Sequence, residues 1–559
     1  MAAASSNTRV LKGDRALAKG ALAAGVEVVT GYPGSPATGV LDGCLEGSAP
    51  GQAHVQWAPN EKVAMEIAYG ASIAGRRALV VLKSVGLNIA LDPLATMALS
   101  GCHAGLVILL GDDPGGWGSQ NEQDSRWMAR VAEVPVVEPV SVEQSAALMT
   151  QAFVWSESLG VPVIVRIVGS LALAEGPVEE PWRPPPFGAG FLRKRDRWVV
   201  LPALVVGRHR SLHRKLRQMR ALFEASPYDA IERRGSGDGS LPVVGVIAVG
   251  HTGAKVRRAL GDDAPVQILS LASVWPLPER ALTRWLRGLE RVLVVEEGGP
   301  FVEEQIRALA QRRGVRVAVL GRADRAISAE GELTEPAIAA ALARLDPALA
   351  HEVASTAGRP MPSRVPLCDD CPYRPVFEAL IAAMDANGGR NRHIVVGETG
   401  CMVRANLPPM RLFDVKYSLG SGLGLGIGLA LGETAPGGKG HRVVALLGDS
   451  SFFHSDINAL PYAAQLDLPM LVVLLDNATT ALTGGQAHPG SATDARGAPQ
   501  KVIDLAEVVR GCGIEPQVIA TEDTAALRAA FAEGLRADAG QGARTRVIIA
   551  RGPCPKYVP

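Results

Sequence analysis

Short apolar runs alternate along the chain with longer stretches in which apolar residues recur at helical spacing. Runs such as "RALVVLKSVG" and "GLVILLGDDPG" are rich in Val and Leu, which is typical of strands buried on both faces. Stretches such as "NEKVAMEIAYGASIAG" and "SVEQSAALMTQAFVWSESLG" have the spacing of helices with one buried face. Strands that alternate with helices predict doubly wound α/β domains, each built on a parallel sheet.

This alternation occurs in three blocks, which are separated by segments of different composition. The Pro- and Gly-rich stretches "EGPVEEPWRPPPFGAG" and "AGRPMPSRVP" mark linkers between the blocks. We therefore predict a first α/β domain over residues 1–175, a linker and connecting helix over 176–240, a second α/β domain over 241–350 and a third over 351–559.

The connecting segment contains the Arg-rich stretch "GRHRSLHRKLRQMRALFEAS", for which two interpretations exist. A solvated helix that joins two domains accounts for the charge without any partner. An RNA-binding arm is the alternative, but the stretch lacks the interleaved aromatic residues of such a module. We favour the connecting helix.

The composition of the 559 residues is that of an ordinary globular protein, with 47% hydrophobic and 20% charged residues. The net charge of +1 gives no argument for a nucleic-acid or membrane partner. No apolar run reaches the ~18–20 residues of a membrane span. The N-terminal "MAAASSNTRVLKGDR" lacks the apolar core of a secretory signal, so we expect a cytoplasmic protein without a disulfide framework.

Two apolar runs in the third block, Val443–Leu447 and Met470–Leu475, end abruptly in polar residues. The first run is followed by Gly448 and Asp449, and the second by Asp476 and Asn477. The intervening "DINALPYAAQLDL" has helical spacing, which predicts a βαβ unit whose two polar ends meet at one edge of the sheet. Ligands of such sheets bind outside the carboxyl ends of the strands.

The oxygens of Asp449 and Asn477 are hard ligands of the kind that Mg²⁺ prefers. Taken singly, each residue has the simpler interpretation of a strand-end turn or a helix cap. Together, "GDS" and "DNATT" resemble the metal-diphosphate motif of thiamine diphosphate enzymes. That resemblance implies that the Asp449 carboxylate, the Asn477 amide and the carbonyl of Thr479 hold the metal.

The Gly-rich stretch "YSLGSGLGLGIGLALGE" over residues 417–433 fits the same domain. Its glycines would allow a close approach of backbone and cofactor, although a tightly packed core helix explains them equally well.

A thiamine enzyme also needs a carboxylate beside N1′ of the cofactor's aminopyrimidine. A carboxyl in an apolar pocket suits proton exchange there, because desolvation raises the pKa of such a group. The helix predicted in "WAPNEKVAMEIAYGASIAG" begins at Glu61, and Glu66 lies five residues later. For an isolated Glu in a first helical turn, contact with the helix dipole is the ordinary role.

A wider resemblance covers nearly the whole chain. "GYPGSPATGVLD", "APNEKVAMEIAYGAS", "LKSVGLNIALDPL" and "GDDPGGWGSQNEQDSR" look like consecutive motifs of the large subunit of indolepyruvate:ferredoxin oxidoreductase, in the 2-oxoacid:acceptor oxidoreductase superfamily. "CDDCPYRPVFEAL", "GETGCMVRANLPP" and "GDSSFFHSDINAL" continue the match in the same order, and "VLVVEEGGPFVEEQI" resembles its transketolase C-terminal-like domain. The three blocks then correspond to pyrimidine-binding, transketolase C-terminal-like and diphosphate-binding domains.

The resemblance implies that Glu61 is the catalytic N1′ carboxylate, and that loop residues of the motifs contact thiamine diphosphate. These residues are Gly34, Ser35, Pro36, Gly86, Asn88, Gly400, Cys401, Gly420, Ser421, Gly422, Gly448, Asp449, Ser450 and Thr483. It further implies Mg²⁺, a small 2-oxo acid substrate, coenzyme A or water as acyl acceptor, an oligomer, a separate small subunit and an external electron acceptor.

The chain departs from the family in two places. It stops at "VIIARGPCPKYVP", where the family continues into a ferredoxin-like domain, so we expect no [4Fe–4S] cluster on this chain alone. The alternative is that Cys368, Cys371 and Cys401 gather a cluster with one remote cysteine. In the family's Cys-Pro-x-Cys-Pro-His motif, Asp369 replaces the first proline and Tyr373 the histidine. This leaves the substrate and the oxidative half-reaction open.

Three functions are therefore weighed. The first is a decarboxylating 2-oxoacid oxidoreductase subunit that acts on an aryl- or branched-chain pyruvate. The second is a non-oxidative thiamine enzyme, namely a decarboxylase, carboxylase or carboligase. The third is a scaffold with a decayed site, which ranks last because Glu61, Asp449 and Asn477 are all present.

Overall fold

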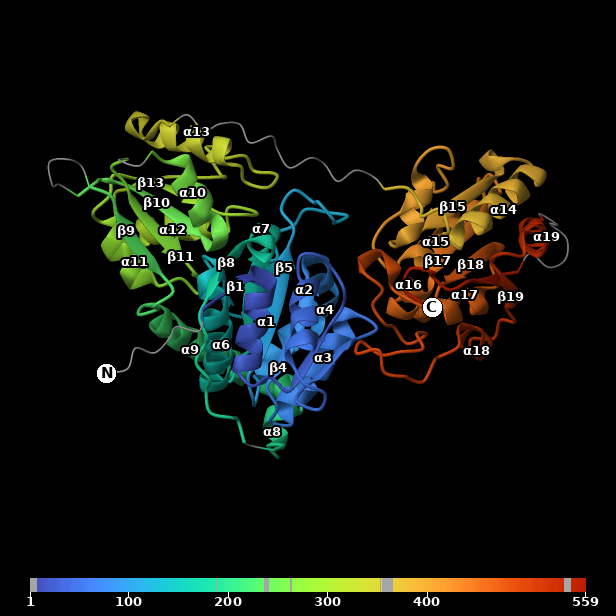
Figure 1. Cartoon of the computed structure of the whole chain (residues 1–559), viewed down its shortest axis with the longest axis horizontal. Helices are drawn as coiled ribbons and strands as arrows, with labels where there is room; N and C mark the ends of the chain where they lie inside the picture. Colours follow the sequence, from blue (N-terminus) through green and yellow to red (C-terminus); the bar gives the residue numbers. More distant parts are fainter. Residues whose placement is uncertain are drawn as a thin grey trace. The chain divides into compact units, whose positions relative to one another are not determined.

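The computed structural model describes residues 8–188, 190–235, 241–261, 264–351, 353, 365–536 and 544–558. The chain divides into two compact units, Met1–Met361 and Pro362–Pro559, coloured blue to yellow and orange to red in Figure 1. Most of the linker predicted at 357–366 lies outside the described residues, and so does the start of the N-terminal stretch. Among the described residues, no helix has the length and apolar character needed to cross a membrane.

The first sheet of unit 1 has seven strands in the order β12-β6-β7-β5-β4-β2-β3. All neighbours in it are parallel except β12 and β6. The parallel strands are β2 (Val28–Gly31), β3 (His54–Trp57), β4 (Ala78–Lys83), β5 (Leu106–Asp112), β6 (Val136–Val137) and β7 (Val163–Val168). The central strands β4, β5 and β7 are buried at every position, as their unbroken apolar runs predict.

Helices pack on this sheet in pairs, and α1 contacts α2 and α6 while α3 contacts α4. The helices are α1 (Gly13–Ala23), α2 (Thr38–Gly47), α3 (Glu61–Ile73), α4 (Ser84–Ser100), α5 (Arg126–Val131), α6 (Val142–Leu159) and α7 (Gly169–Leu173). The predicted helices around residues 60–75 and 141–160 are thus present as α3 and α6. A short antiparallel pair, β1 (Arg9–Lys12) with β8 (Glu175–Val178), was not predicted.

The second sheet of unit 1 has the order β14-β13-β10-β11-β9. Its strands are β9 (Ala230–Arg233), β10 (Val244–Val249), β11 (Gln267–Leu271), β13 (Arg291–Val295) and β14 (Ala318–Leu320). Helices α10 (Gly253–Ala259), α11 (Glu279–Leu286), α12 (Phe301–Arg313) and α13 (Glu335–Leu345) accompany it. Only β9 runs antiparallel to its neighbour among these described strands.

The apolar stretch "QILSLASV" predicts one strand, but the structure divides it into β11 and β12 (Ser273–Trp275). β12 leaves the second sheet and pairs with β6 at the edge of the first. The physical reason lies at the junction, where the N–H groups of Ala272 and Ser273 donate to the Asp229 carboxylate at 2.6 and 3.0 Å. Those donors are therefore not available to continue the β11 ladder.

The Arg-rich stretch forms α9 (Pro202–Phe223), which follows the short α8 (Arg195–Trp198). Its buried residues Leu212, Leu216, Met219 and Phe223 lie on one face at helical spacing. Basic side chains of α9 are used within the chain; for example, Lys215 Nζ donates to the carbonyl of Gly160 at 2.8 Å. These contacts favour the connecting helix over the RNA-binding arm.

A buried ion network joins the two sheets of unit 1 around Arg126, whose side chain is fully buried. Its guanidinium lies 2.6 Å from the carboxylate of Asp124, 2.8 Å from that of Glu296 and 3.5 Å from that of Glu138. Burial raises the pKa of Glu296 to about 7, although the Arg126 charge opposes that shift. The buried charges of Arg126 and of Arg166, which lies 2.9 Å from Glu138, therefore compensate the buried carboxylates of this network.

We expect Arg126→Met to lower the free energy of unfolding by about 3–5 kcal/mol, because the remaining carboxylates lose their buried counter-charge. Urea denaturation at neutral pH measures the change. Arg130→Met on the same helix is the matched control, since Arg130 is exposed and its removal should cost little. Equal losses in both variants would contradict the prediction.

Unit 2 contains one all-parallel sheet in the order β16-β15-β17-β18-β20-β19. The strands are β15 (His393–Gly397), β16 (Val415–Lys416), β17 (Arg442–Gly448), β18 (Met470–Asp476), β19 (Gln517–Ala520) and β20 (Arg546–Arg551). β17 and β18 pair in parallel with Val443 opposite Met470, so the predicted βαβ unit is present.

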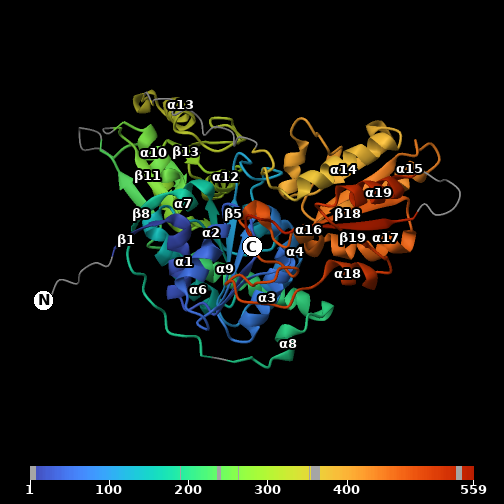
Figure 2. The ribbon, with the colours of Figure 1, turned by 45° about the vertical axis from the view of Figure 1, so that its right-hand side comes forward.

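Two layers of helices cover this sheet. α14 (Tyr373–Ala386) and α19 (Thr524–Leu535) share a core with Val444 and Leu446 of β17. Val443 and Leu447 of the same strand face the opposite core, which contains residues of α15 (Gly422–Thr434), α16 (Asp449–His454), α17 (Leu460–Leu466) and α18 (Leu505–Gly511). Figure 2 shows α14 and α19 on one side of the sheet and α17 and α18 on the other. The predicted doubly wound α/β class is confirmed.

Candidate functional site

In the first sheet of unit 1, strand order reverses at β2. β3 is added on one side of β2 and β4 on the other, so the carboxyl ends of β2 and β4 flank a topological switch point. The predicted residues Gly34–Pro36 follow β2, and Gly86 and Asn88 lie at the start of α4, directly after β4. The topology therefore places these predicted residues at the edge where open α/β sheets bind ligands.

Glu61 is the first residue of α3 and is 5% exposed. The side chain of Asn60 caps this helix by accepting from the N–H of Val63 at 2.8 Å. A Cβ added at Gly86 would lie only 2.5 Å from Glu61 Cγ, so glycine is the residue that leaves room for the carboxyl. Two predicted residues from different motifs, Glu61 and Gly86, are thus in contact.

Lys83, the last residue of β4, lies at the same edge of the sheet, although it was not among the predicted cofactor residues. A Cβ added at Gly34 would meet Lys83 Cβ at 2.8 Å, which shows how closely the loop after β2 approaches the end of β4. The Lys83 ammonium is buried, donates to the carbonyl of Gly118 at 2.7 Å and lies 3.7 Å from Asp113. Burial lowers the pKa of Lys83, and the nearby Asp113 opposes the shift.

Asn88 is held by a second side chain from the "GDDPGGWGSQNEQDSR" motif. Its amide exchanges two hydrogen bonds with the amide of Gln123, at 2.9 and 3.1 Å. Gln123 also donates to the carbonyl of Ser84 at 3.1 Å, which ties the loop after β5 to the start of α4.

Unit 2 repeats this arrangement, because β16 and β17 are added on opposite sides of β15. Gly400 and Cys401 follow β15, and helix α16 begins with Asp449 and Ser450 directly after β17. The segment after β15 contacts the start of α16, since Ser451 Oγ donates to the carbonyl of Thr399 at 3.2 Å. A second switch point is therefore lined by predicted cofactor residues.

The predicted metal ligands come together at this edge. Asp449 Oδ2 accepts from the N–H of Asn477 at 3.0 Å, and Asn477 Oδ1 accepts from the N–H of Thr479 at 3.2 Å. Ala478, between them, adopts a positive φ of 63°, a strained backbone for a residue other than glycine. The loop after β18 is therefore held in a special conformation beside the carboxylate.

His488, which lies eleven residues after Asn477 in the sequence, was missed by the sequence reasoning. Its buried Nε2 lies 3.2 Å from Asp449 Oδ2, at an angle outside hydrogen-bond geometry. Its Nδ1 accepts from the N–H of Gly490 at 3.0 Å, which places the proton of a neutral ring on Nε2, facing Asp449. Thr483, which was predicted to bind the cofactor, donates its hydroxyl to Gln486 at 2.6 Å.

The start of the Gly-rich helix α15 is occupied by carboxyl groups of the protein. The N–H groups of Gly420 and Gly422 donate to Glu398, and that of Leu423 donates to Asp456 at 2.9 Å. Burial, with the neighbouring Glu398, raises the pKa of Asp456 to about 8. Ser421, the other predicted residue here, donates its hydroxyl to the carbonyl of Ser418 at 2.7 Å.

Four cysteines lie near the same edge, drawn from three segments. Burial raises the pKa of Cys401 to about 11, and Cys371, Cys554 and Cys368 are near enough to add to that shift. The N–H of Cys554 donates to the carbonyl of Asn477 at 3.1 Å, which fixes this cysteine beside the loop after β18. Within the described part of the chain, no three cysteine sulfurs lie within 4.8 Å of one another.

Tyr373, which stands where the resemblance places a histidine, is buried at the start of α14. Its hydroxyl donates to the carbonyl of Leu475 at 3.4 Å, at the carboxyl end of β18. Burial raises the pKa of this phenol well above its ordinary value, and Asp449 and Cys401 add to the shift. A neutral phenol therefore lies beside the predicted metal ligands.

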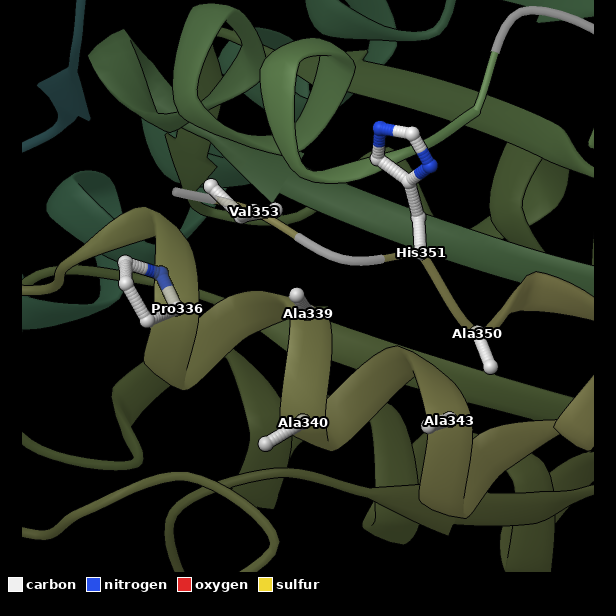
Figure 3. Close-up of a pocket in the computed structure, with 7 residues that line it drawn as sticks. All are labelled: Pro336, Ala339, Ala340, Ala343, Ala350, His351 and Val353. Carbon is white, nitrogen blue, oxygen red and sulfur yellow. The ribbon is translucent and has the colours of Figure 1, made fainter. Parts of the chain in front are cut away.

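A different hollow, of about 320 Å³, lies in unit 1 against α13 (Figure 3). Alanines and other small apolar residues line it, together with His351. Its lining contains none of the residues that the motifs predict.

The residues present in unit 2 fit a polar ligand. Two buried atoms at the switch point, Thr399 Oγ1 and His488 Nε2, have no hydrogen-bond partner among the described residues. The carboxylate of Asp449 and the amide oxygen of Asn477 supply the hard oxygens that a Mg²⁺–diphosphate unit needs. Buried polar groups without partners are uncommon and point to something absent from the protein alone.

Comparison with known proteins agrees with this geometry. Residues 398–546 match the family "Thiamine pyrophosphate enzyme, C-terminal TPP binding domain", and residues 19–181 match "Pyruvate flavodoxin/ferredoxin oxidoreductase, thiamine diP-bdg". The chain is 34% identical to indolepyruvate oxidoreductase subunit IorA of Pyrococcus abyssi, over 98% of this chain and 86% of that protein. It is 32% identical to the IorA subunit of Archaeoglobus fulgidus, over 97% and 86%.

A solved 2-oxoglutarate:ferredoxin oxidoreductase from Magnetococcus marinus superimposes with a TM-score of 0.45 at 18% identity, over 56% of this chain and 62% of that one. The assignment depends on the sequence relatives, whose identity extends across both units. The predicted family is therefore confirmed. The chain belongs to the indolepyruvate oxidoreductase IorA family of thiamine diphosphate-dependent 2-oxoacid oxidoreductases.

Proposed function

We propose that this chain binds thiamine diphosphate with Mg²⁺ and oxidatively decarboxylates an arylpyruvate. One 2-oxo acid and one coenzyme A thiol give an acyl thioester, CO₂, one proton and two electrons. The observation that carries the proposal is the buried Asp449–Asn477 pair at the ends of β17 and β18, within a family of thiamine enzymes. The names of the relatives support the arylpyruvate class.

Asp449, Asn477 and the carbonyl of Thr479 would hold Mg²⁺, because they supply one charged and two neutral hard oxygens. Thiamine diphosphate, when bound, supplies the electron sink for decarboxylation. His488 places its Nε2 at 3.2 Å from the Asp449 carboxylate, at the edge of the same site. The buried phenol of Tyr373 adds an uncharged donor to the same edge.

In unit 1, Glu61 holds and exchanges a proton at N1′ of the aminopyrimidine. Its burial at the start of α3, against Gly86, supports that role. The loop Gly34–Pro36 and the start of α4 form the walls that orient the ring. Asn88, which is held by Gln123, lies in that wall.

A separate partner subunit is part of the proposal, since the relatives are named as subunits. The two electrons must leave this chain singly to reach a one-electron acceptor such as a ferredoxin. The four cysteines Cys368, Cys371, Cys401 and Cys554 support a [4Fe–4S] cluster as the first electron carrier.

This proposal adopts the alternative of a cluster with one remote cysteine in place of our expectation of none on this chain. The remote cysteine is Cys554, which follows β20 and which the parallel sheet returns to the same edge. A single zinc ion holds its thiolates about 3.8 Å apart, given Zn–S bonds of ~2.3 Å, whereas no three of these sulfurs lie within 4.8 Å of one another. A four-iron cluster binds each thiolate at a separate iron and therefore spans a wider set of cysteines.

We expect the chain to hold about four iron and four sulfide per protein after anaerobic reconstitution, since Cys₄ is the ordinary ligand set of a [4Fe–4S] cluster. Iron and sulfide analysis, with electron paramagnetic resonance of the reduced chain, measures this. Cys554→Ser should lose the signal, and Cys512→Ser, directly after α18, is the matched control that should keep it. If the wild-type chain holds no iron, the proposed cluster is wrong, and the first electron carrier must belong to another subunit.

The reaction itself is tested on the chain purified from its own cells with whatever subunit accompanies it. We expect indolepyruvate, coenzyme A and a one-electron dye to give CO₂ and reduced dye in a ratio of one to two, because each turnover releases two electrons. Release of CO₂ with an aldehyde and no reduced dye would identify a non-oxidative enzyme instead. If the purified chain does not bind thiamine diphosphate, the proposed function is wrong.

A further inference from the structure

Glu133, His209 and His213 form a cluster that the thiamine chemistry does not use. Their ligand atoms all lie within 4.8 Å of one another, and the part of the chain that the structure describes contains no other such group of His, Cys, Asp or Glu. His209 Nε2 lies 2.6 Å from one carboxylate oxygen of Glu133, and His213 Nε2 lies 3.0 Å from the other. The two imidazole rings have centroids 4.2 Å apart.

Local structure brings these three groups together. His209 and His213 are four residues apart on α9, so they lie on one face of that helix, one turn apart. Glu133 follows α5 and adopts a φ of 55°, in the left-handed region where glycine is favoured after a helix. The chain therefore accepts backbone strain at a position where it presents a carboxylate to two imidazoles.

Two imidazole nitrogens and one carboxylate oxygen are the ligand set of a zinc ion with an open position. With metal–ligand bonds of about 2.0–2.2 Å, neighbouring ligand atoms in a tetrahedral site lie ~3.3 Å apart. The contact between the chosen carboxylate oxygen and its imidazole, at 2.6 or 3.0 Å, needs to open by less than 1 Å, and all three ligand atoms already lie within 4.8 Å of one another. We propose that Glu133, His209 and His213 bind a Zn²⁺ ion, with water completing the coordination.

The site lies at the surface of unit 1, where the two histidines are exposed and Glu133 is partly buried. The exposed Arg210 and Arg214 of α9 oppose a cation, but solvent screens their charges. The metal would fasten α9 to the end of α5, the helix that begins at the buried Arg126. This metal site of unit 1 is separate from the proposed reaction.

Metal binding is tested on the full chain after chelator treatment, first with Zn²⁺ alone by calorimetry. We expect one saturable site, and His209→Gln, His213→Gln and Glu133→Gln should each lower the Zn²⁺ affinity by about tenfold or more. Loss of a residue that only supports a metal ligand already costs about that much, and loss of a ligand itself should cost at least as much. His351→Gln is the matched control, since His351 is exposed elsewhere in unit 1. Unchanged stoichiometry and affinity in the three ligand variants would overturn the proposal.

Two further measurements keep the outcome unambiguous. Co²⁺ bound by nitrogen and oxygen shows visible d–d absorption without the near-ultraviolet charge-transfer bands of a thiolate, so it separates this site from the four cysteines. A thiolate spectrum alone would contradict the proposal. Glu133→Gly removes the carboxylate while relieving the backbone, so it should fold normally and lose the Zn²⁺-dependent rise in Tm. A rise as large as that of the wild-type chain would also contradict it.

Discussion

Replacing Glu61 with glutamine is expected to slow exchange of the C2 proton of bound thiamine diphosphate by ~10²-fold or more, while cofactor affinity stays close to normal. Glutamine keeps the shape of the side chain against Gly86, where an added Cβ would come within 2.5 Å of Glu61 Cγ. It has no carboxyl proton to exchange with N1′, so the loss falls on the chemistry and not on packing. Proton exchange in D₂O, followed by nuclear magnetic resonance, measures the rate.

Glu66→Gln is the matched control for this variant. Glu66 lies on the same helix, but its side chain is 47% exposed and pairs with Lys62. We expect its removal to leave exchange unchanged, because a solvated ion pair on a helix surface contributes little. Normal exchange in Glu61→Gln together with slow exchange in Glu66→Gln would transfer the role to Glu66.

Replacing Asp449 with alanine is expected to abolish Mg²⁺-dependent binding of thiamine diphosphate. Asp449 is the only charged residue in the proposed ligand set, and Asn477 and Thr479 contribute neutral oxygens alone. A ligand at 100 times its Kd stabilises the native state by about 2.7 kcal/mol, so the wild-type Tm should rise with cofactor and metal while that of the variant should not. Differential scanning fluorimetry with and without Mg²⁺ measures the increment.

The increment, and not the absolute Tm, is the informative quantity. Asp449 also accepts from the backbone N–H groups of Ser450 and Asn477, so its loss weakens unit 2 even without ligand. Asp385→Ala, an exposed position on α14, is the matched control and should retain the full increment. An undiminished increment in Asp449→Ala would refute the metal assignment.

Much of the fold could be predicted from the hydrophobic pattern, because a short run made only of apolar residues such as Val and Leu is typical of a parallel strand that is buried on both faces. The same argument placed Asp449 beside Asn477, since consecutive parallel strands in a βαβ unit end at one edge. The pattern did not predict β12 as a separate strand. The apolar run "QILSLASV" does not show that the Asp229 carboxylate accepts from two N–H groups near the end of the run. Periodicity reports burial, and hydrogen bonds from distant residues decide which sheet is continued.

The sequence by itself determined the α/β class, the order of the motifs and the strand-end position of the metal ligands, because each depends on local pattern and short-range topology. Only the tertiary structure decided that His488 faces Asp449, that Asp456 neighbours Glu398 and that Cys554 joins the other cysteines. It also brought Glu133 to two histidines that lie more than seventy residues away in sequence. Such contacts form where segments that are distant in sequence meet at a sheet edge or helix surface. The hydrophobic periodicity of the sequence carries no information about them.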